Sequence, residues 1–224
     1  MSGKTATVIG ATGLVGGHLL QLLLHEKKYD RIRLIVRRQA AIELPGADIK
    51  IISFENNMEF ENAISGSDVV FCAVGTTQKK VKGDQLAYRK IDFDIPVTAA
   101  KLCKRTGCNT FVFVSSVGAN SKSNNFYLNL KGETEDSIKE FSLKQTHIMR
   151  PSVLLGSRKE SRAGEKIAGG MMSAFSFLLM GKFRKYKPME AENVAKAMLA
   201  ASLLKQEGFT IYEYDDMIKL INGK

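Results

Sequence analysis

The junction between the first apolar run and the first helical pattern constrains this chain most. A β-branched run at 5–10 leads into Gly10, Gly13 and Gly16, and a leucine-rich pattern of helical period covers 13–28. A strand that turns through glycines into a helix lets backbone N–H groups approach an anion at the positive end of the helix dipole. The spacing is G-x-x-G-x-x-G, not the commoner G-x-G-x-x-G, but it serves the same geometry. It predicts a turn that holds the pyrophosphate of a dinucleotide, with a ligand-free glycine turn as the alternative.

The rest of the chain alternates apolar runs with helical patterns. Continuous apolar strands that alternate with helices predict a parallel sheet covered on both faces. We therefore predict an α/β fold, a Rossmann-like three-layer sandwich with a mostly parallel sheet and a small C-terminal cap. Further strands are expected at 31–38, 49–54, 67–75, 110–116 and 146–156, and helices at 85–106 and 126–141.

The pattern changes after about residue 157. Helical patterns cover 164–180 and 190–205, a short strand is expected at 209–214, and a helix ends the chain. No linker rich in Pro, Gly or Ser separates this region, and the length suits one domain. We expect a single NAD(P)-binding Rossmann domain over 1–224, in which about 157–224 forms mostly cap and substrate-side elements.

Composition limits the classes of function. The chain has 224 residues, with 33 Lys and Arg against 23 Asp and Glu, a formal charge of +10. These basic residues are scattered apart from a run at 182–187, and no zinc-finger spacing, basic heptad segment or RNP-like motif appears, so specific nucleic-acid binding is not expected. The longest apolar stretch, 171–180, is too short to cross a bilayer as a helix. The apolar and basic segment 171–187 is expected to be part of a cap, with a dimer contact or a membrane-surface contact as alternatives.

Cysteines and histidines predict no metal site. The three cysteines follow no ligand spacing and cannot all pair, and no signal peptide begins the sequence, so a reduced, cytoplasmic setting is expected. The three histidines also lack ligand spacing. Structural roles are expected for them.

Two arginines end the second predicted strand. Rossmann folds that select NAD usually place an acidic residue there, for the ribose 2′-hydroxyl. Arg37 and Arg38 stand at this position instead. A guanidinium offers a planar set of donors to a 2′-phosphate. The pair predicts NADP(H) over NAD(H), with two solvated surface arginines as the alternative.

A reactive set is expected at the carboxyl end of the sheet. Tyr127 and Lys131 stand four residues apart on a predicted helix, so their side chains share one face. An ammonium stabilises a nearby phenolate, and such a tyrosine can exchange a proton with a carbonyl or an alcohol. Ser115 and Ser116 end the fifth predicted strand, where ligands bind in such folds. We favour Ser116 to orient the substrate oxygen, because it lies further past the strand, and Ser115 stays open.

These segments together resemble a known family. The chain is similar to atypical short-chain dehydrogenases/reductases with an NAD(P)-binding Rossmann fold, and more closely to the Tat-interacting oxidoreductase-like branch. The resemblance spans residues 8–162. It is carried by GATGLVGGHLL, VRR, FCAVGTT, VSSVGANSKSNNFYLNLKGETE and RPSVLLGSRKESR.

The resemblance implies NADP(H) in the cleft and roles for particular residues. Tyr127 and Lys131 are expected at the nicotinamide ribose, with Tyr127 as proton donor. Leu154 is expected behind the nicotinamide, and Arg162 is expected to reach back toward the nucleotide or substrate. The active-site asparagine of larger relatives has no clear counterpart, and the corresponding segment offers Asp92 instead. The pyrophosphate turn is expected at Thr12, Gly13, Leu14 and Val15, the 2′-phosphate site at Arg37 and Arg38, and the adenosine side at Val74 and Gly75.

Two hypotheses of function follow. The first is an NADPH-dependent oxidoreductase that reduces a small carbonyl compound through a Ser-Tyr-Lys site, because the cap is too small for a bulky substrate. The alternative is an NADPH-binding, redox-responsive regulatory or interaction protein with little or no catalysis. A monomer or a homodimer is expected, and a protein partner fits the second hypothesis.

Overall fold

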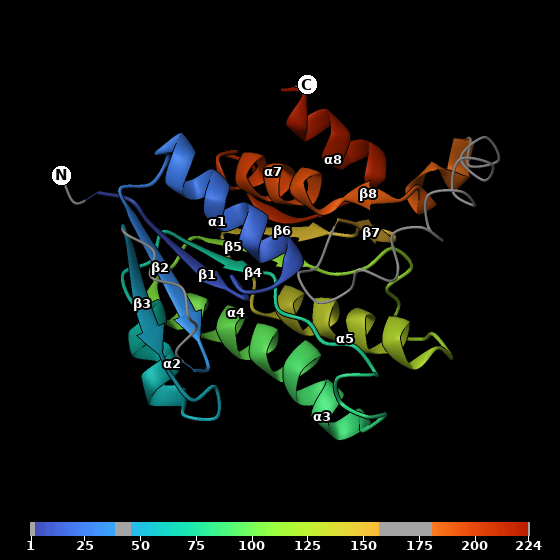
Figure 1. The fold of residues 1–224 in the computed structure, drawn as a ribbon, viewed down its shortest axis with the longest axis horizontal. Coiled ribbons are helices and arrows are strands. Elements are labelled where there is room, and N and C mark those ends of the chain that lie inside the picture. The colour runs from blue at the N-terminus through green and yellow to red at the C-terminus, as the bar shows by residue number, and fades with distance from the viewer. Residues whose placement is uncertain (1–2, 39–45, 157–180, 224) are drawn as a thin grey trace.

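Seven parallel strands form the centre of the molecule (Figure 1). The computed structural model describes residues 3–38, 46–156 and 181–223. The strand order is β3-β2-β1-β4-β5-β6-β9, and every neighbouring pair is parallel. The strands are β1 (Thr5–Ile9), β2 (Arg31–Val36), β3 (Ala47–Ile51), β4 (Val69–Cys72), β5 (Thr110–Val114), β6 (Gln145–Met149) and β9 (Gly208–Tyr212).

Helices cover both faces of this sheet and make a three-layer sandwich (Figure 1). One core cluster joins the sheet to α1, α7 and α8, and a second joins it to α2, α4 and α5. The α/β, Rossmann-like fold expected from the sequence is confirmed. The helices of the first face are α1 (Leu14–Glu26), α7 (Ala191–Ser202) and α8 (Tyr214–Ile221), and those of the second are α2 (Asn57–Ile64), α4 (Ile95–Thr106) and α5 (Phe126–Glu140).

The helix predicted over 85–106 forms as one helical run with a change of pitch inside it. α3 (Gln85–Arg89) passes through a π-helical turn, Lys90–Asp94, into α4. Asp92, in the middle of that turn, is buried. π-helical turns inside α-helices are rare and often occur at functional sites, so this turn is considered with the site below.

Two local features differ from the expectation. β3 ends at Ile51, whereas the apolar pattern predicts a strand over 49–54, because this edge strand leaves most of its side chains exposed and its pattern is weak. α2 is not predicted from periodicity at all. Its start nevertheless carries a signal, since the side chain of Asn56 accepts hydrogen bonds from the N–H groups of Met58 and Glu59, as an N-cap residue does.

The described chain after residue 187 builds the sandwich, which differs from the cap expected over about 157–224. β9 pairs with β6 at one edge of the sheet, and α7 packs against α1 through small buried side chains such as Ala195. A short parallel ladder joins β7 (Leu154–Leu155) to β8 (Met189–Glu190). The helix predicted over 164–180 lies outside the described residues.

Basic residues of the 182–187 run face the acidic start of α8. Arg184 pairs with Asp215 at 2.8 Å, and Lys185 pairs with Glu213 at 3.5 Å. Two of the charges that could attract a membrane surface are therefore engaged within the fold.

Gly10 and Gly16 account for the glycine spacing. Gly10 has φ +90°, and a Cβ there would lie 2.7 Å from the carbonyl carbon of Ala73. A Cβ on Gly16 would overlap the carbonyl oxygen of Gly10. The first turn of α1 therefore rests directly on the end of β1. Gly17, the next residue, would make only an ordinary contact, 3.6 Å from the oxygen of Ala11.

Adjacent alanine substitutions in α1 are expected to have opposite effects. Gly16→Ala should lower the free energy of unfolding by roughly 2–4 kcal/mol, because the methyl group has no space. Gly17→Ala should raise it by about 0.5–1 kcal/mol, because alanine has the higher helix propensity. Urea denaturation of both variants measures the difference, and equal effects would contradict the close contact.

His147 on β6 is a buried histidine with one unpartnered ring nitrogen. Its Nδ1 lies 3.0 Å from the hydroxyl of Tyr212, and within the described part of the chain Nε2 has no hydrogen-bond partner. Burial lowers the pKa of His147 to about 4. The unfolded chain has the ordinary histidine pKa of about 6.5. The unfolded state therefore binds this proton first as the pH falls, and the folded state loses stability between about pH 6.5 and 4.

Replacing His147 should flatten this part of the pH dependence. Between pH 7.5 and 5, wild type should lose about 2 kcal/mol more stability than His147→Gln, because glutamine does not titrate. Urea denaturation of both proteins at the two pH values measures this. Parallel losses in the two proteins would show that His147 does not cause the effect.

Candidate functional site

The turn at 10–16 leaves backbone donors available at the carboxyl end of the sheet. Gly13 is the N-cap of α1, no side chain caps this helix, and its first turn carries no acidic residue. The first-turn N–H groups, those of Leu14, Val15 and Gly16, have no acceptor within the helix. The N–H of Gly13 already donates to Gly10 at 2.9 Å. Thr12 and Gly13 are exposed, so the turn can approach an anion.

A cavity of about 660 Å³ opens beside the ends of β2 and β3. Arg37 lines it, as do Ile52 and Phe54 after β3 and Ile91 from the π turn. Arg38 is exposed at the next position and is not among the lining residues. A pocket of this size with mixed apolar and charged walls can hold the adenosine half of a dinucleotide. The sequence motifs did not predict that Ile52, Phe54 and Ile91 line this cavity, because apolar residues in loops and turns have no distinctive spacing.

The chain after β4 runs past Asp92. A Cβ on Gly75 would lie 3.4 Å from Asp92 Oδ1, and the N–H of Thr76 donates to Asp92 Oδ2 at 2.8 Å. Val74 packs partly against the α4 side of the core. Neither Val74 nor Gly75 lines the 660 Å³ cavity, so their contact with adenosine stays a prediction.

Tyr127 and Lys131 both lie on α5. Tyr127 is partly exposed, and Lys131 is buried. The side chain of Lys131 is 4% exposed, and its Nζ lies 3.0 Å from Asp92 Oδ1. Burial acts to lower the pKa of Lys131, but the nearby Asp92 carboxylate and Tyr127 outweigh it, so the pKa is raised. The ring of Tyr127 packs edge-on against Tyr88, with centroids 6.4 Å apart. The result is a charged lysine beside a tyrosine that solvent can reach.

The two serines after β5 differ in what they contact. Ser115 is buried and donates its hydroxyl hydrogen bond to Glu135. Glu135 also accepts from Arg150, with Nε at 3.0 Å and Nη2 at 2.5 Å. Ser116 is partly exposed, and its Oγ is 3.4 Å from the oxygen of Val117. Ser116 therefore has the hydroxyl that can reach a ligand, whereas Ser115 belongs to a buried network.

Gly132 seats the loop after β5 on α5. A Cβ on Gly132 would overlap the backbone of Asn120 and Ser121. Asn129 Nδ2 donates to the oxygen of Ser121 at 2.6 Å, and the N–H of Asn120 donates to the oxygen of Leu128 at 3.0 Å. This loop is therefore held against the helix that carries Tyr127 and Lys131. Sequence reasoning did not identify Gly132, although a glycine in a helix interior is a signal of close packing.

The last two predicted contacts fall on the segment after β6. Leu154 lies in β7 and is partly buried against the first core cluster. A Cβ on Gly156 would lie 3.4 Å from Leu14, so this segment passes the start of α1. Arg162 lies outside the described residues.

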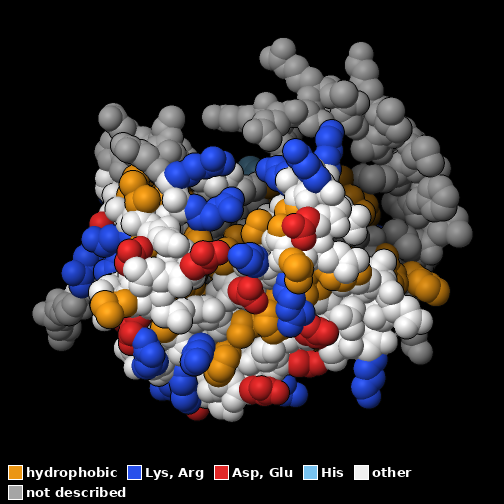
Figure 2. Space-filling model, turned by 90° about the horizontal axis from the view of Figure 1, so that it is seen from below, with side chains coloured by type: hydrophobic (Ala, Val, Ile, Leu, Met, Phe, Trp, Pro, Cys, Tyr) orange, Lys and Arg blue, Asp and Glu red, His pale blue; other side chains and the backbone are white. Residues whose placement is uncertain are grey.

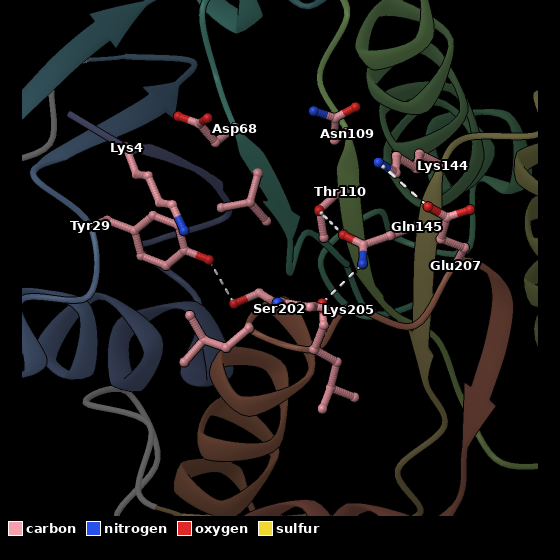
Figure 3. Close-up of a pocket in the computed structure, with 13 residues that line it drawn as sticks. Lys4, Tyr29, Asp68, Asn109, Thr110, Lys144, Gln145, Ser202, Lys205 and Glu207 are labelled. Atoms are coloured by element: carbon pink, nitrogen blue, oxygen red, sulfur yellow. Dashed lines mark hydrogen bonds and ion pairs between the residues drawn. The ribbon is translucent and has the colours of Figure 1, made fainter. Parts of the chain in front are cut away.

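A second cavity, of about 450 Å³, lies at the amino end of the sheet (Figure 3). Several of its polar side chains are paired with one another. Tyr29 donates to Ser202 at 2.9 Å, and Thr110 donates to Gln145 at 2.7 Å. Ligands of open α/β sheets bind at the carboxyl ends of the strands, so we assign no ligand to this cavity.

Expectations from composition concern the charged surface, possible metal ligands and possible membrane spans, and the structure describes these for part of the chain. Figure 2 shows the face formed by α2, α4 and α5, where Lys and Arg side chains are interspersed with Asp and Glu. Among the described residues, no group of three or more His, Cys, Asp or Glu is placed to hold a metal ion. Within the same ranges, no helix is long and apolar enough to cross a membrane.

Comparison with known proteins identifies the family. The family model described as NAD(P)H-binding matches residues 10–202. The HTATIP2 protein of Rattus norvegicus is 35% identical over 171 residues, which cover 75% of this chain and 70% of that protein. The chain belongs to the NAD(P)H-binding family. Within it, the chain is an atypical short-chain dehydrogenase/reductase of the HTATIP2-like branch, as its motifs suggest.

Another relative extends the match over nearly the whole chain. The FMP52 protein of Candida albicans, which is described as mitochondrial, is 32% identical over 230 residues, 96% of this chain and 97% of its own length. A dTDP-glucose 4,6-dehydratase of Streptomyces venezuelae, solved with NAD bound, superposes with a TM-score of 0.72 at 12% identity, covering 92% of this chain and 74% of its own. At this identity the superposition shows the fold alone.

These comparisons support a nicotinamide cofactor and an oxidoreductase-like protein. They leave the choice between NADP and NAD open. The cytoplasmic location, the oligomeric state and the role of each site residue stay predictions.

Proposed function

We propose that the protein is an NADPH-dependent reductase of a small carbonyl compound. The observation that carries the proposal is Lys131, which is buried and ion-paired with Asp92 next to the partly exposed Tyr127. If the Tyr-Lys pair were only two surface residues of a helix, both side chains would be exposed to solvent. This pair instead lies on the helix seated beside the end of β5, at the sheet end where the N-terminus of α1 is uncapped.

The described residues fit the cofactor. The exposed turn at Thr12 and Gly13 and the free first-turn N–H groups of α1 suit a pyrophosphate. Arg37, in the wall of the 660 Å³ cavity, supports recognition of a 2′-phosphate. When bound, NADPH supplies the hydride.

The side chains of the site would manage the substrate oxygen. Ser116 would hold it by a hydrogen bond, and Tyr127 would donate the proton that completes the alcohol. Lys131 would hold the nicotinamide ribose hydroxyls, and its charge would stabilise the phenolate left on Tyr127. α7 and β9 belong to the sandwich, which leaves less chain for a cap and supports a compact substrate.

Tyr127→Phe should lower the rate of NADPH oxidation with aldehydes, ketones or quinones at least about 100-fold, because the proton donor is lost. The dissociation constant for NADPH should change little. Stopped-flow absorbance at 340 nm and isothermal titration calorimetry measure the two quantities. Tyr29→Phe, the same chemical change at the amino end of the sheet, is the matched control and should keep the wild-type rate.

The outcomes of this experiment separate the two hypotheses. Wild-type turnover in Tyr127→Phe would rule out the proposed proton donor. NADPH binding without turnover of any carbonyl compound by wild type would favour the regulatory or interaction protein instead.

Replacing Arg37 and Arg38 together by alanine should weaken NADPH binding about 10- to 100-fold, because charge-assisted hydrogen bonds to the 2′-phosphate are lost. NADH lacks that phosphate, so its affinity should stay within about twofold of wild type and serves as the internal control. Calorimetric titration with both cofactors measures the change. Equal weakening for NADPH and NADH would contradict a 2′-phosphate site at these arginines.

A further inference from the structure

Asp92 connects three elements through three different oxygens. Its Oδ1 lies 3.0 Å from Lys131 Nζ on α5, and its Oδ2 accepts the N–H of Thr76 at 2.8 Å, in the loop after β4. Its backbone oxygen accepts from the hydroxyl of Thr134 at 3.3 Å. The residue itself is 1% exposed. Both carboxylate oxygens are therefore committed to partners that the α3–α4 run does not contain.

Lys131 depends on this carboxylate for its charge. A buried ammonium without a counter-charge gives up its proton or costs several kcal/mol. The other described groups that face Lys131 include no carboxylate. They are Tyr127 from its own helix, the thiol of Cys72 from β4 and the ring of Phe113 from β5, whose centroid is 5.0 Å from Nζ.

The remaining ionisable neighbours are also occupied. Tyr88, from α3, faces Asp92 and donates its hydroxyl hydrogen bond to the oxygen of Thr76. Glu135, on the next turn of α5, is paired with Arg150 and Ser115. Among the described residues, Asp92 is thus the carboxylate that lies against Lys131.

We propose that Asp92 is the positioning residue of the site: its carboxylate fixes the Lys131 ammonium, keeps it charged and ties it to the loop at Thr76. The π turn places Asp92 in contact with Lys131, because Asp92 is its middle residue. The catalytic meaning of this role rests on the proposed function. The charge of Lys131 does not depend on the proposed function, because it is a property of the ligand-free protein.

An aspartate is required for both contacts. Asparagine at position 92 has one acceptor oxygen, so its amide nitrogen must face either the Lys131 ammonium or the Thr76 N–H. Asp92→Asn therefore removes the counter-charge and one acceptor while it keeps the size of the side chain. Asp136→Asn, the same change at an exposed position of α5, is the matched control.

The first measurement follows the side chain of Lys131 by NMR in the ligand-free protein. The protein carries ¹³C-labelled lysine, and the Lys131 signal is assigned from its loss in Lys131→Met. The pKa of Lys131 should lie above the ordinary lysine value in wild type and in Asp136→Asn, and should be at least about one unit lower in Asp92→Asn than in wild type. The same titration curve in Asp92→Asn and wild type would overturn the proposal.

The second measurement is the NADPH dissociation constant across pH 6–10. In Asp92→Asn, affinity should fall as Lys131 loses its charge and should recover toward wild type at low pH, whereas a purely structural defect would weaken binding at every pH. Wild type that binds no NADPH would refute the proposed function and leave the NMR test of Asp92 intact. Should Asp92→Asn fail to fold, wild type alone decides: a pKa of Lys131 well below the ordinary lysine value would overturn the proposal.

Discussion

Two charges buried on one face of α5 must be paired, and their pairing fixes where this helix lies. Lys131 obtains its counter-charge from Asp92 in the π turn, and Glu135 obtains its own from Arg150 at the end of β6. Removing one partner of a buried ion pair costs about 3–5 kcal/mol. α5 therefore cannot slide along the sheet without exposing or orphaning a charge. Tyr127, one turn before Lys131, is held at the carboxyl end of the sheet by the same constraint.

The stripe Tyr127, Lys131 and Glu135 is unusual for the inward face of a helix, which normally buries apolar side chains. It is tolerated because Lys131 and Glu135 each reach a charged partner from another element, and Tyr127 stays partly exposed. Ser115 joins the end of β5 to Glu135, and Gly132 lets the loop after β5 lie against the helix. The polar contacts thus converge where the apolar core gives way to the end of the sheet. A site there is supported by ion pairs and close backbone contacts.

Much of the architecture follows from local sequence patterns, because strands buried on both faces read as apolar runs and the glycine turn marks the first crossover. The features that the sequence missed have non-local causes. β3 is an exposed edge strand with a weak pattern, and α7 and β9 join the sandwich through contacts with α1 and β6, which are distant in the chain. Tyr127 and Lys131 could be paired by their spacing. The ion pair between Asp92 and Lys131 could not be predicted, because hydrophobic periodicity does not show that a π turn brings Asp92 inward.

The two ends of the sheet show why the carboxyl end is the candidate site. At the amino end, Tyr29 donates to Ser202, and Gln145 accepts from Thr110 and donates to the oxygen of Leu204, so a ligand that uses these groups would have to break existing hydrogen bonds. At the carboxyl end, the first-turn N–H groups of α1 have no acceptor in the helix and no capping side chain. Unpaired donors at a dipole's positive end gain most from an anionic ligand. The same turn that requires glycine at positions 10 and 16 therefore also leaves the free donors to which a pyrophosphate would bind in the proposed function.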